Sequence, residues 1–271
     1  MKKLLIFTDL DGSLLDHHDY SWQLAAPAIA ALKKLSYPLV INSSKTAAEI
    51  SALKKELDNN HPFVCENGAV VNFPTNYFNA AKKVEDDEPL VAHFFAVPYP
   101  LVIKVLNELR SQYGFKFSGF HDLQPEELVS LTGLDREQAL KATLRQASEP
   151  LKWRGDEDEL ERFKSLLFQQ GLTVTKGGRF IHVMSPVNKG DAVAWLKRSY
   201  QSHEPETEWL TVGIGDSYND LSMLQRVDYP ILIANPASPQ PDVSLIKNIY
   251  KTELPGPAGW NQAVLELINS F

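Results

Sequence analysis

The sequence has few of the features that mark secreted, membrane or nucleic-acid-binding proteins. Among its 271 residues there is one cysteine, Cys65, which excludes an intramolecular disulfide and fits a reducing compartment. No stretch approaches the about 18 uninterrupted apolar residues of a membrane-spanning helix, and the chain enters a strand at once, without a signal peptide. The net charge of −7 gives no general affinity for nucleic acid. We therefore expect a cytoplasmic protein with neither a membrane nor a nucleic-acid partner.

What the chain does contain is an alternation of strands and helices. Residues 4–7 and 38–42 read as buried strands, and each is followed by a polar loop and a helix, over residues 23–35 and 46–57. This rhythm predicts a parallel sheet. From about residue 80 the alternation is lost, and it returns near residue 187. The length also suits two domains.

We therefore predict an α/β fold with a Rossmann-like parallel-sheet core, residues 1–85 and 187–271, and an inserted α+β domain, residues 86–186. The expected elements of the insertion are strands over 91–97 and 151–153, helices over 100–113, 125–131, 135–146 and 156–170, and a hairpin over 172–176 and 180–185. After it we expect a helix over 188–200, strands over 207–214 and 230–234, a further core piece over 246–250, and a helix over 259–268.

The first strand ends in two carboxylates, Asp9 and Asp11, followed by Gly12 and Ser13. Side chains at positions i and i+2 of a strand point the same way, and ligands of open α/β sheets bind at the carboxyl ends of the strands. Adjacent carboxylates repel each other unless a cation or a shared proton relieves them. The stretch favours a divalent-metal site with one nucleophilic and one acid/base carboxylate, and a solvated turn is the alternative.

Polar residues also mark other strand ends and helix starts. Ser43 follows the second strand, where it would either bind a phosphate oxygen or cap the next helix. Lys189 lies in a first helical turn, an unfavourable place for a cation unless its charge has a use such as phosphate binding; a plain surface lysine is the alternative. Asp216 and Asp220 follow the strand over 207–214, and N-capping is the simpler reading of Asp216.

Taken together, these pieces resemble the haloacid dehalogenase-like phosphohydrolase superfamily. The motifs are Asp9-Leu-Asp11-Gly-Ser, Ser43, Lys189 and Gly215-Asp216-Ser-Tyr-Asn219-Asp220, in this order. The insertion, with Glu66-Asn67-Gly68 before it, resembles the large-cap Cof-type branch.

The resemblance implies a Mg²⁺-dependent phosphatase in which Asp9 forms an aspartyl-phosphate and Asp11 is the acid and base. It implies Mg²⁺ ligands from Asp9, Asp216 and Asp11, the last through its main-chain carbonyl. It further implies phosphate contacts from Ser43, Lys189 and Asn219, with Asp220 orienting Lys189 or a metal-bound water.

Further segments resemble the family of mannosyl-3-phosphoglycerate phosphatases, whose product is the compatible solute mannosylglycerate. They are Ser43-Ser-Lys-Thr46, Leu131-Thr-Gly-Leu134, Arg145-Gln-Ala-Ser-Glu-Pro150, Gly178-Arg-Phe-Ile-His182 and Gly256-Pro-Ala-Gly-Trp-Asn261. Phosphatases of glucosyl-3-phosphoglycerate and sucrose phosphate look similar. A phosphotransferase, or a binding protein without catalysis, is a further alternative, and the chain is expected to be a monomer or homodimer.

A phosphorylated sugar-glycerate carries about three negative charges, so the site needs cations. The candidate substrate-binding residues are Lys45, Arg145, Glu149, Arg179 and His182. For Arg145 and Glu149 the alternative is an ion pair on one helix. For His182 it is a partly buried strand histidine, and Trp260 is read mainly as a packing residue.

Overall fold

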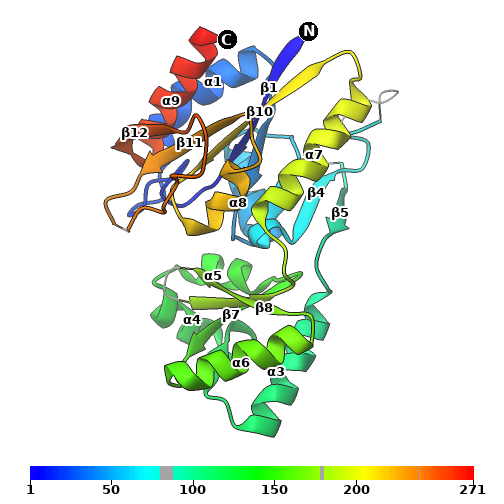
Figure 1. Cartoon of the computed structure of the whole chain (residues 1–271), viewed down its shortest axis with the longest axis vertical. Coiled ribbons are helices and arrows are strands. Elements are labelled where there is room, and N and C mark those ends of the chain that lie inside the picture. Colours follow the sequence, from blue (N-terminus) through cyan, green and yellow to red (C-terminus); the bar gives the residue numbers. More distant parts are fainter. Residues whose placement is uncertain (80–87, 178–179, 238) are drawn as a thin grey trace.

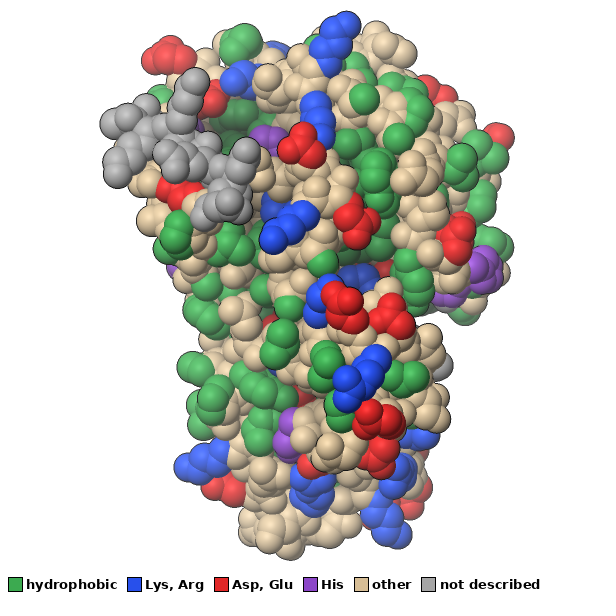
Figure 2. All heavy atoms as spheres, turned by 180° about the vertical axis from the view of Figure 1, so that it is seen from behind, with side chains coloured by type: hydrophobic (Ala, Val, Ile, Leu, Met, Phe, Trp, Pro, Cys, Tyr) green, Lys and Arg blue, Asp and Glu red, His purple; other side chains and the backbone are tan. Residues whose placement is uncertain are grey.

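The computed structural model describes residues 1–79, 88–177, 180–237 and 239–271. These residues form two units, each built on a sheet of its own (Figure 1). Both chain termini lie in the larger unit, and the smaller unit is formed by the middle of the chain. A waist separates the two units, with charged side chains of both signs along it (Figure 2).

The larger unit is organised around an eight-stranded sheet with the order β12-β11-β10-β1-β2-β3-β4-β5. The six strands from β12 to β3 are parallel, and β4 and β5 are antiparallel additions at one edge. The strands are β1 (Lys2–Thr8), β2 (Leu39–Asn42), β3 (Phe63–Cys65), β4 (Val70–Pro74), β5 (Leu90–Phe94), β10 (Glu208–Gly215), β11 (Tyr229–Ala234) and β12 (Tyr250–Pro255).

Helices cover both faces of this sheet, as the alternation of buried side chains in β1 requires. Leu4 and Ile6 pack on one face, against α1 (Ala26–Lys34), α2 (Ala47–Glu56) and α9 (Gly256–Ser270). Leu5 and Phe7 pack on the other face, against α7 (Lys189–His203) and α8 (Leu221–Leu224). Because successive strand side chains point to opposite faces, an all-apolar strand needs a cover on both. The predicted α/β core with helices on a parallel sheet is thereby confirmed.

The smaller unit is an antiparallel four-stranded sheet with helices on both faces. Its strands are β6 (Phe117–Gly119), β7 (Ser148–Trp153), β8 (Thr173–Gly177) and β9 (Phe180–Met184), in the order β6-β7-β9-β8. The helices α3 (Tyr99–Tyr113) and α6 (Glu157–Gln169) pack on one face. The helices α4 (Pro125–Thr132) and α5 (Arg136–Thr143) pack together beside Phe120 and Phe180, and α5 contacts α2 of the larger unit (Figure 1). Four 3-10 helices complete the elements of the described residues: Gln23–Ala25, Glu66–Gly68, Phe120–Asp122 and Tyr218–Asp220.

Some elements differ from those expected. The strand expected over 91–97, inside the insertion, is β5, which pairs with β4 of the large sheet. The helix expected to reach residue 146 ends at Thr143, and β7 begins at Ser148 instead of residue 151. The main-chain N–H groups of Gln146 and Ala147 donate to the Glu66 carboxylate instead of continuing the helix, so a contact across the waist overrides local helical propensity.

The expectation for the C-terminal segment was also partly wrong. The piece expected over 246–250 is followed by the actual strand, Tyr250–Pro255, and the last helix begins at Gly256 rather than Gly259. The strand lies at the sheet edge and is mostly exposed, so its sequence lacks the apolar pattern of a buried strand. No helix in the described part of the chain is long and apolar enough to cross a membrane.

Contacts tie the two units together close to the ends of β2 and β3. Glu66 is fully buried and accepts hydrogen bonds from the N–H groups of Gln146 and Ala147 and from the Ser148 hydroxyl, at 2.7, 3.1 and 2.6 Å. The Arg145 guanidinium donates to the Ser44 carbonyl at 3.1 Å. The smaller unit is therefore docked on the segments that follow β2 and β3.

Trp260 lies at the centre of the larger unit. It is fully buried among the residues between the sheet and α9, and its indole N–H donates to the Thr8 hydroxyl at 2.9 Å. That hydroxyl donates to the Asp9 carbonyl at 2.7 Å. The tryptophan therefore packs, as expected, and also fixes the end of β1.

A pair of matched substitutions isolates this hydrogen bond. Trp209 is 3% exposed, and its indole N–H has no partner among the described residues. Trp260→Phe and Trp209→Phe remove the same atoms, but only the first breaks a hydrogen bond. We expect Trp260→Phe to lower the free energy of unfolding by about 1–2 kcal/mol more than Trp209→Phe. Equal losses in urea denaturation would contradict this role of the indole.

Candidate active site

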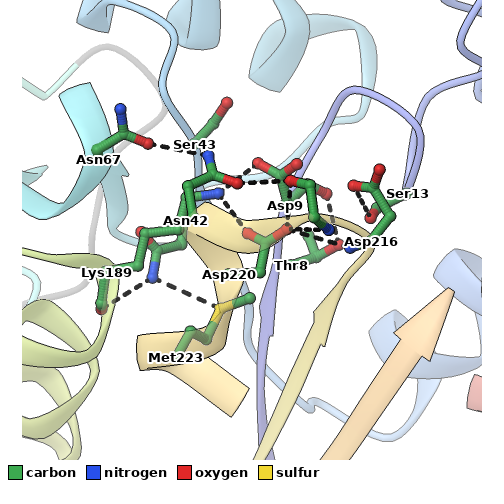
Figure 3. A network of polar contacts seen from close by, with 12 residues as sticks. Thr8, Asp9, Ser13, Asn42, Ser43, Asn67, Lys189, Asp216, Asp220 and Met223 are labelled. Atoms are coloured by element: carbon green, nitrogen blue, oxygen red, sulfur yellow. Dashed lines mark hydrogen bonds and ion pairs between the residues drawn. The ribbon is translucent and has the colours of Figure 1, made fainter. Parts of the chain in front are cut away.

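Two neighbouring parallel strands bring the carboxylates together. β1 and β10 are paired with Thr8 opposite Ile214, so both strands end at the same edge of the sheet. Asp9 follows β1, and Asp216 and Asp220 follow β10. One carboxylate oxygen from each of these three residues lies within 4.8 Å of the other two, and all three residues are buried (Figure 3).

Lys189 is the cation of this cluster. Its amine lies 2.6 Å from Asp9 Oδ1 and 2.6 Å from Asp220 Oδ1, and the residue is fully buried. Burial opposes the charge on Lys189, but Asp220 and Asp9 outweigh it and raise the pKa of the amine. The lysine is therefore charged wherever the protein is folded.

The start of α7 is placed by close backbone packing. The Asn42 side-chain amide donates to the Lys189 carbonyl at 3.1 Å. Gly68 has a φ of +97°, and a Cβ there would lie 2.2 Å from the Asn188 carbonyl oxygen, so only glycine fits against the residue that precedes Lys189.

Asp220 has its carboxylate surrounded by donors. Oδ1 accepts from Lys189, and Oδ2 accepts from the N–H groups of Asp216 and Ser217 and from the Ser217 hydroxyl, at 3.1, 3.0 and 3.1 Å. These contacts orient the carboxylate toward Lys189. A residue held in this way suits a positioning role more than a metal ligand.

Asp9 and Asp216 are less well neutralised. Burial raises the pKa of Asp9 well above its ordinary value; Lys189 opposes this rise, and Asp220 and Asp216 add to it. Burial and the charge of Asp220 likewise raise the pKa of Asp216 to about 6. Three carboxylates against one ammonium group leave a negative excess in a buried place, which a divalent cation would neutralise. An all-oxygen donor set suits a hard cation such as Mg²⁺, so these residues fit the metal that the family implies.

The loop after β1 packs tightly on Asp216. The Ser13 hydroxyl and the Asn235 side-chain amide donate to Asp216 at 3.2 and 2.5 Å. Gly12 has a φ of +80°, and a Cβ there would come within 2.9 Å of Asp216 Oδ2. Glycine therefore allows the loop to reach the carboxylate.

The Asp11 side chain lies apart from the buried cluster. It is 38% exposed, and its Oδ2 lies 3.1 Å from the Lys45 amine. Burial lowers the pKa of Lys45, but Asp11 and Glu49 outweigh this effect and raise it, so the lysine is charged. The carboxylate of Asp11 thus pairs with Lys45, which lines a cleft together with residues of both units.

The other expected phosphate contacts are Ser43 and Asn219. Ser43 is buried, and its hydroxyl accepts from the Lys45 N–H at 3.3 Å. The Asn219 side-chain amide donates to Asn67 Oδ1 at 3.1 Å (Figure 3).

Of the expected substrate contacts in the insertion, two lie at the junction. Arg145 donates to the Ser44 carbonyl and lies near His182. Burial, with a smaller effect of Arg145, lowers the pKa of His182 to about 3, so this histidine is neutral. Its Nδ1 atom is buried without a partner among the described residues. Arg179 lies outside the described residues.

Glu149 is placed differently. It follows the end of α5 rather than sharing a helix with Arg145, so the two do not form a helical ion pair. Its fully buried carboxylate accepts the Tyr99 hydroxyl at 2.7 Å and the His121 N–H at 3.0 Å, and it contacts His121 Nδ1 at 2.8 Å. Glu149 is thus engaged inside the smaller unit.

Sequence reasoning missed two residues of the site, Asn42 and Asn235. Asn42 directly precedes Ser43 and ends β2, so its position at a strand end was a usable signal. Asn235 also follows a strand directly, β11, but no motif marked it. Its contact with Asp216 depends on the pairing of β10 with β11.

The sequence of this chain is similar to those of known phosphatases. A family model described as haloacid dehalogenase-like hydrolase matches residues 6–240. A glucosyl-3-phosphoglycerate/mannosyl-3-phosphoglycerate phosphatase of Methanococcoides burtonii is 39% identical over 267 residues, which cover 98% of this chain and 97% of that protein. A protein of the same name from Persephonella marina is 37% identical over 269 residues, 99% of this chain and 98% of its own.

Among solved structures, a haloacid dehalogenase-like hydrolase from Bacteroides thetaiotaomicron superposes with a TM-score of 0.67 at 18% identity, over 98% of this chain and 100% of that chain. At this identity the likeness concerns the fold alone. The expected family resemblance is confirmed by the family model and the two curated relatives together: this chain belongs to the haloacid dehalogenase-like hydrolases.

Proposed function

We propose that this chain is a Mg²⁺-dependent phosphatase that hydrolyses mannosyl-3-phosphoglycerate to mannosylglycerate and phosphate, and that glucosyl-3-phosphoglycerate is the alternative substrate. The observation that carries the chemistry is the buried Asp9 carboxylate, held 2.6 Å from Lys189 beside Asp216. The names of the two curated relatives support the substrate. The reaction releases a small sugar-glycerate, and the chain would act as a monomer or homodimer in the cytoplasm.

Asp9 is the nucleophile of the proposed reaction. One carboxylate oxygen of Asp9 forms a bond to phosphorus while the bond from phosphorus to the glycerate oxygen breaks. Asp11, whose carboxylate lies 3.1 Å from the Lys45 amine, gives its proton to the departing oxygen. Asp11 then takes a proton from water, and that water attacks phosphorus to release phosphate and restore Asp9.

Charge on the transferred phosphoryl group is balanced by cations and donors already in place. Lys189, Ser43 and Asn219 would hold the non-bridging oxygens of the phosphoryl group; Lys189 lies 2.6 Å from Asp9, and Ser43 is buried. Mg²⁺, bound by Asp9, Asp216 and the Asp11 main-chain carbonyl, would neutralise the repulsion between carboxylate and phosphate.

The smaller unit would act as a cap that supplies substrate contacts. Lys45, on the loop after β2, pairs with Asp11. Arg145 of the cap donates to the Ser44 carbonyl on the same loop and lies near His182, so these three residues would suit the glycerate carboxylate. We propose a core of residues 1–85 and 187–271 and a cap of residues 86–186, with the cap helices and strands beginning after β5. The two connections would be the hinges of closure over the substrate.

The activity is tested by phosphate release with Mg²⁺ from three compounds: mannosyl-3-phosphoglycerate, glucosyl-3-phosphoglycerate and sucrose 6-phosphate. We expect the sugar-glycerates to be preferred and Asp9→Asn to lower kcat at least about a thousandfold, because it removes the nucleophile. Asp58→Asn, at a side chain that is 83% exposed, is the matched control and should retain activity. Release from a wide range of phosphate esters by Asp9→Asn would exclude the mechanism.

Metal binding predicts a specific pH dependence of stability. The pKa of Asp216 in the folded protein is about 6, above that of an unfolded aspartate, so the metal-free protein loses stability as pH rises from about 4 to about 6. Asp9 acts in the same direction. Because Mg²⁺ binds the deprotonated forms, it should raise the Tm more at about pH 7.5 than at about pH 5.

The measurement is the Tm with millimolar Mg²⁺ against that with a chelator, at both pH values. Asp216→Asn removes one ligand and one titrating group, so it should reduce both the Mg²⁺ effect and its pH dependence. An equal rise in Tm at both pH values, or one unchanged in Asp216→Asn, would argue against this site.

A further inference from the structure

A cleft to which the proposed reaction gives no role lies between the core and the cap. Its volume is about 300 Å³, at the lower end of the about 300–1,000 Å³ of small-molecule sites. The core contributes Tyr20, Lys45 and Glu49, and the cap contributes Leu134 and Gln138. Leu134 ends the segment Leu131-Thr-Gly-Leu134, which resembles a segment of the mannosyl-3-phosphoglycerate phosphatases. The proposed reaction gives this segment no role.

The cleft continues the active site on the side of the leaving group. Lys45 lines the cleft, and its amine lies 3.1 Å from Asp11, the residue that protonates the leaving oxygen. Leu15 also lines it, and its carbonyl accepts the N–H of Gly12, directly after Asp11. A leaving group that extends past Asp11 therefore enters this space.

The walls of the cleft suit a neutral ring with hydroxyl groups. Three acidic residues, Asp19, Glu49 and Glu56, line it with two lysines, Lys45 and Lys141. The Lys141 amine is already paired with Glu137 at 2.6 Å, so the lining has no excess of free positive charge. This balance disfavours a further anion. Carboxylates and the Gln138 amide bind hydroxyl groups, and the Tyr20 ring offers an apolar face.

Tyr20 is held in place by its loop. Its φ of +58° lies in the left-handed region, which is unfavourable for a residue with a side chain. The loop is closed by hydrogen bonds from the Tyr20 N–H to the Asp16 carbonyl and from the Asp16 N–H to the Ser21 carbonyl, at 3.2 and 2.9 Å. The Lys45 amine lies 5.2 Å from the centre of the Tyr20 ring, and both residues line the cleft.

We infer that this cleft is the hexose subsite of the enzyme, with Tyr20 as the platform on which the sugar ring of the substrate stacks. The inference rests on the proposed function and deepens it, because it assigns the sugar to the leaving-group side of the site. Arg145 and His182, which do not line the cleft, then remain for the glycerate carboxylate.

The test compares a ligand that carries the hexose with one that lacks it. For each variant, KM and kcat are measured on mannosyl-3-phosphoglycerate, and Ki is measured for 3-phosphoglycerate as a competitive inhibitor. Tyr20→Ala should raise KM about tenfold while Ki changes less than about twofold, because only the sugar contact is lost. Tyr20→Phe keeps the ring and should recover most of the lost affinity.

A second pair of variants fills the cleft instead of removing a contact. Ala52 lines the cleft on α2, and Ser51 is its neighbour on the same helix outside the lining. Ala52→Trp should raise KM for the sugar substrate by about tenfold or more and leave Ki for 3-phosphoglycerate unchanged. Ser51→Trp is the matched control and should leave both constants unchanged.

The possible outcomes separate the two proposals. A preserved KM in Tyr20→Ala and Ala52→Trp, or equal increases in KM and Ki, would overturn the hexose subsite while the phosphatase activity stands. If the wild-type enzyme releases no phosphate from any sugar-glycerate phosphate, the proposed function fails, and the subsite fails with it.

Discussion

The ammonium group of Lys189, buried between Asp9 and Asp220, is the interaction on which the rest of the site depends. It joins the start of α7 to the ends of β1 and β10. Because the residue is fully buried, water does not solvate its charge, and the two carboxylates must balance it. Removing one partner of such a group typically costs about 3–5 kcal/mol, since the other charge stays buried and unpaired. The same contact therefore supports both the fold and the nucleophile.

The site keeps more negative charge than its own lysine can balance. Asp9 and Asp216 remain near each other in a buried place, and burial raises the pKa of both carboxyl groups. By itself, this arrangement lowers the stability of the folded protein. A divalent cation bound as proposed would offset this excess of negative charge and stabilise the folded protein.

Two buried or partly buried side chains, Glu66 and Arg145, connect the cap to the core beside the site. Glu66 has a φ of +53° and is fully buried, and its carboxylate binds the cap backbone where α5 has just ended. Arg145 binds the carbonyl of Ser44, between Ser43 and Lys45. The cap is thus linked directly to the loop that carries Ser43 and Lys45, two of the proposed substrate-binding residues.

The sequence by itself determined the parallel core and the strand ends that bear Asp9 and Asp216, because these depend on local apolar runs and on motifs contiguous in the chain. Only the tertiary structure decided which distant groups meet. The contact of Asn235 with Asp216 follows from strand pairing, and Glu149 turns into the cap because Tyr99 and His121 offer it donors there. The cleft at Tyr20 exists only where the core and the cap meet, so no single stretch of sequence encodes it.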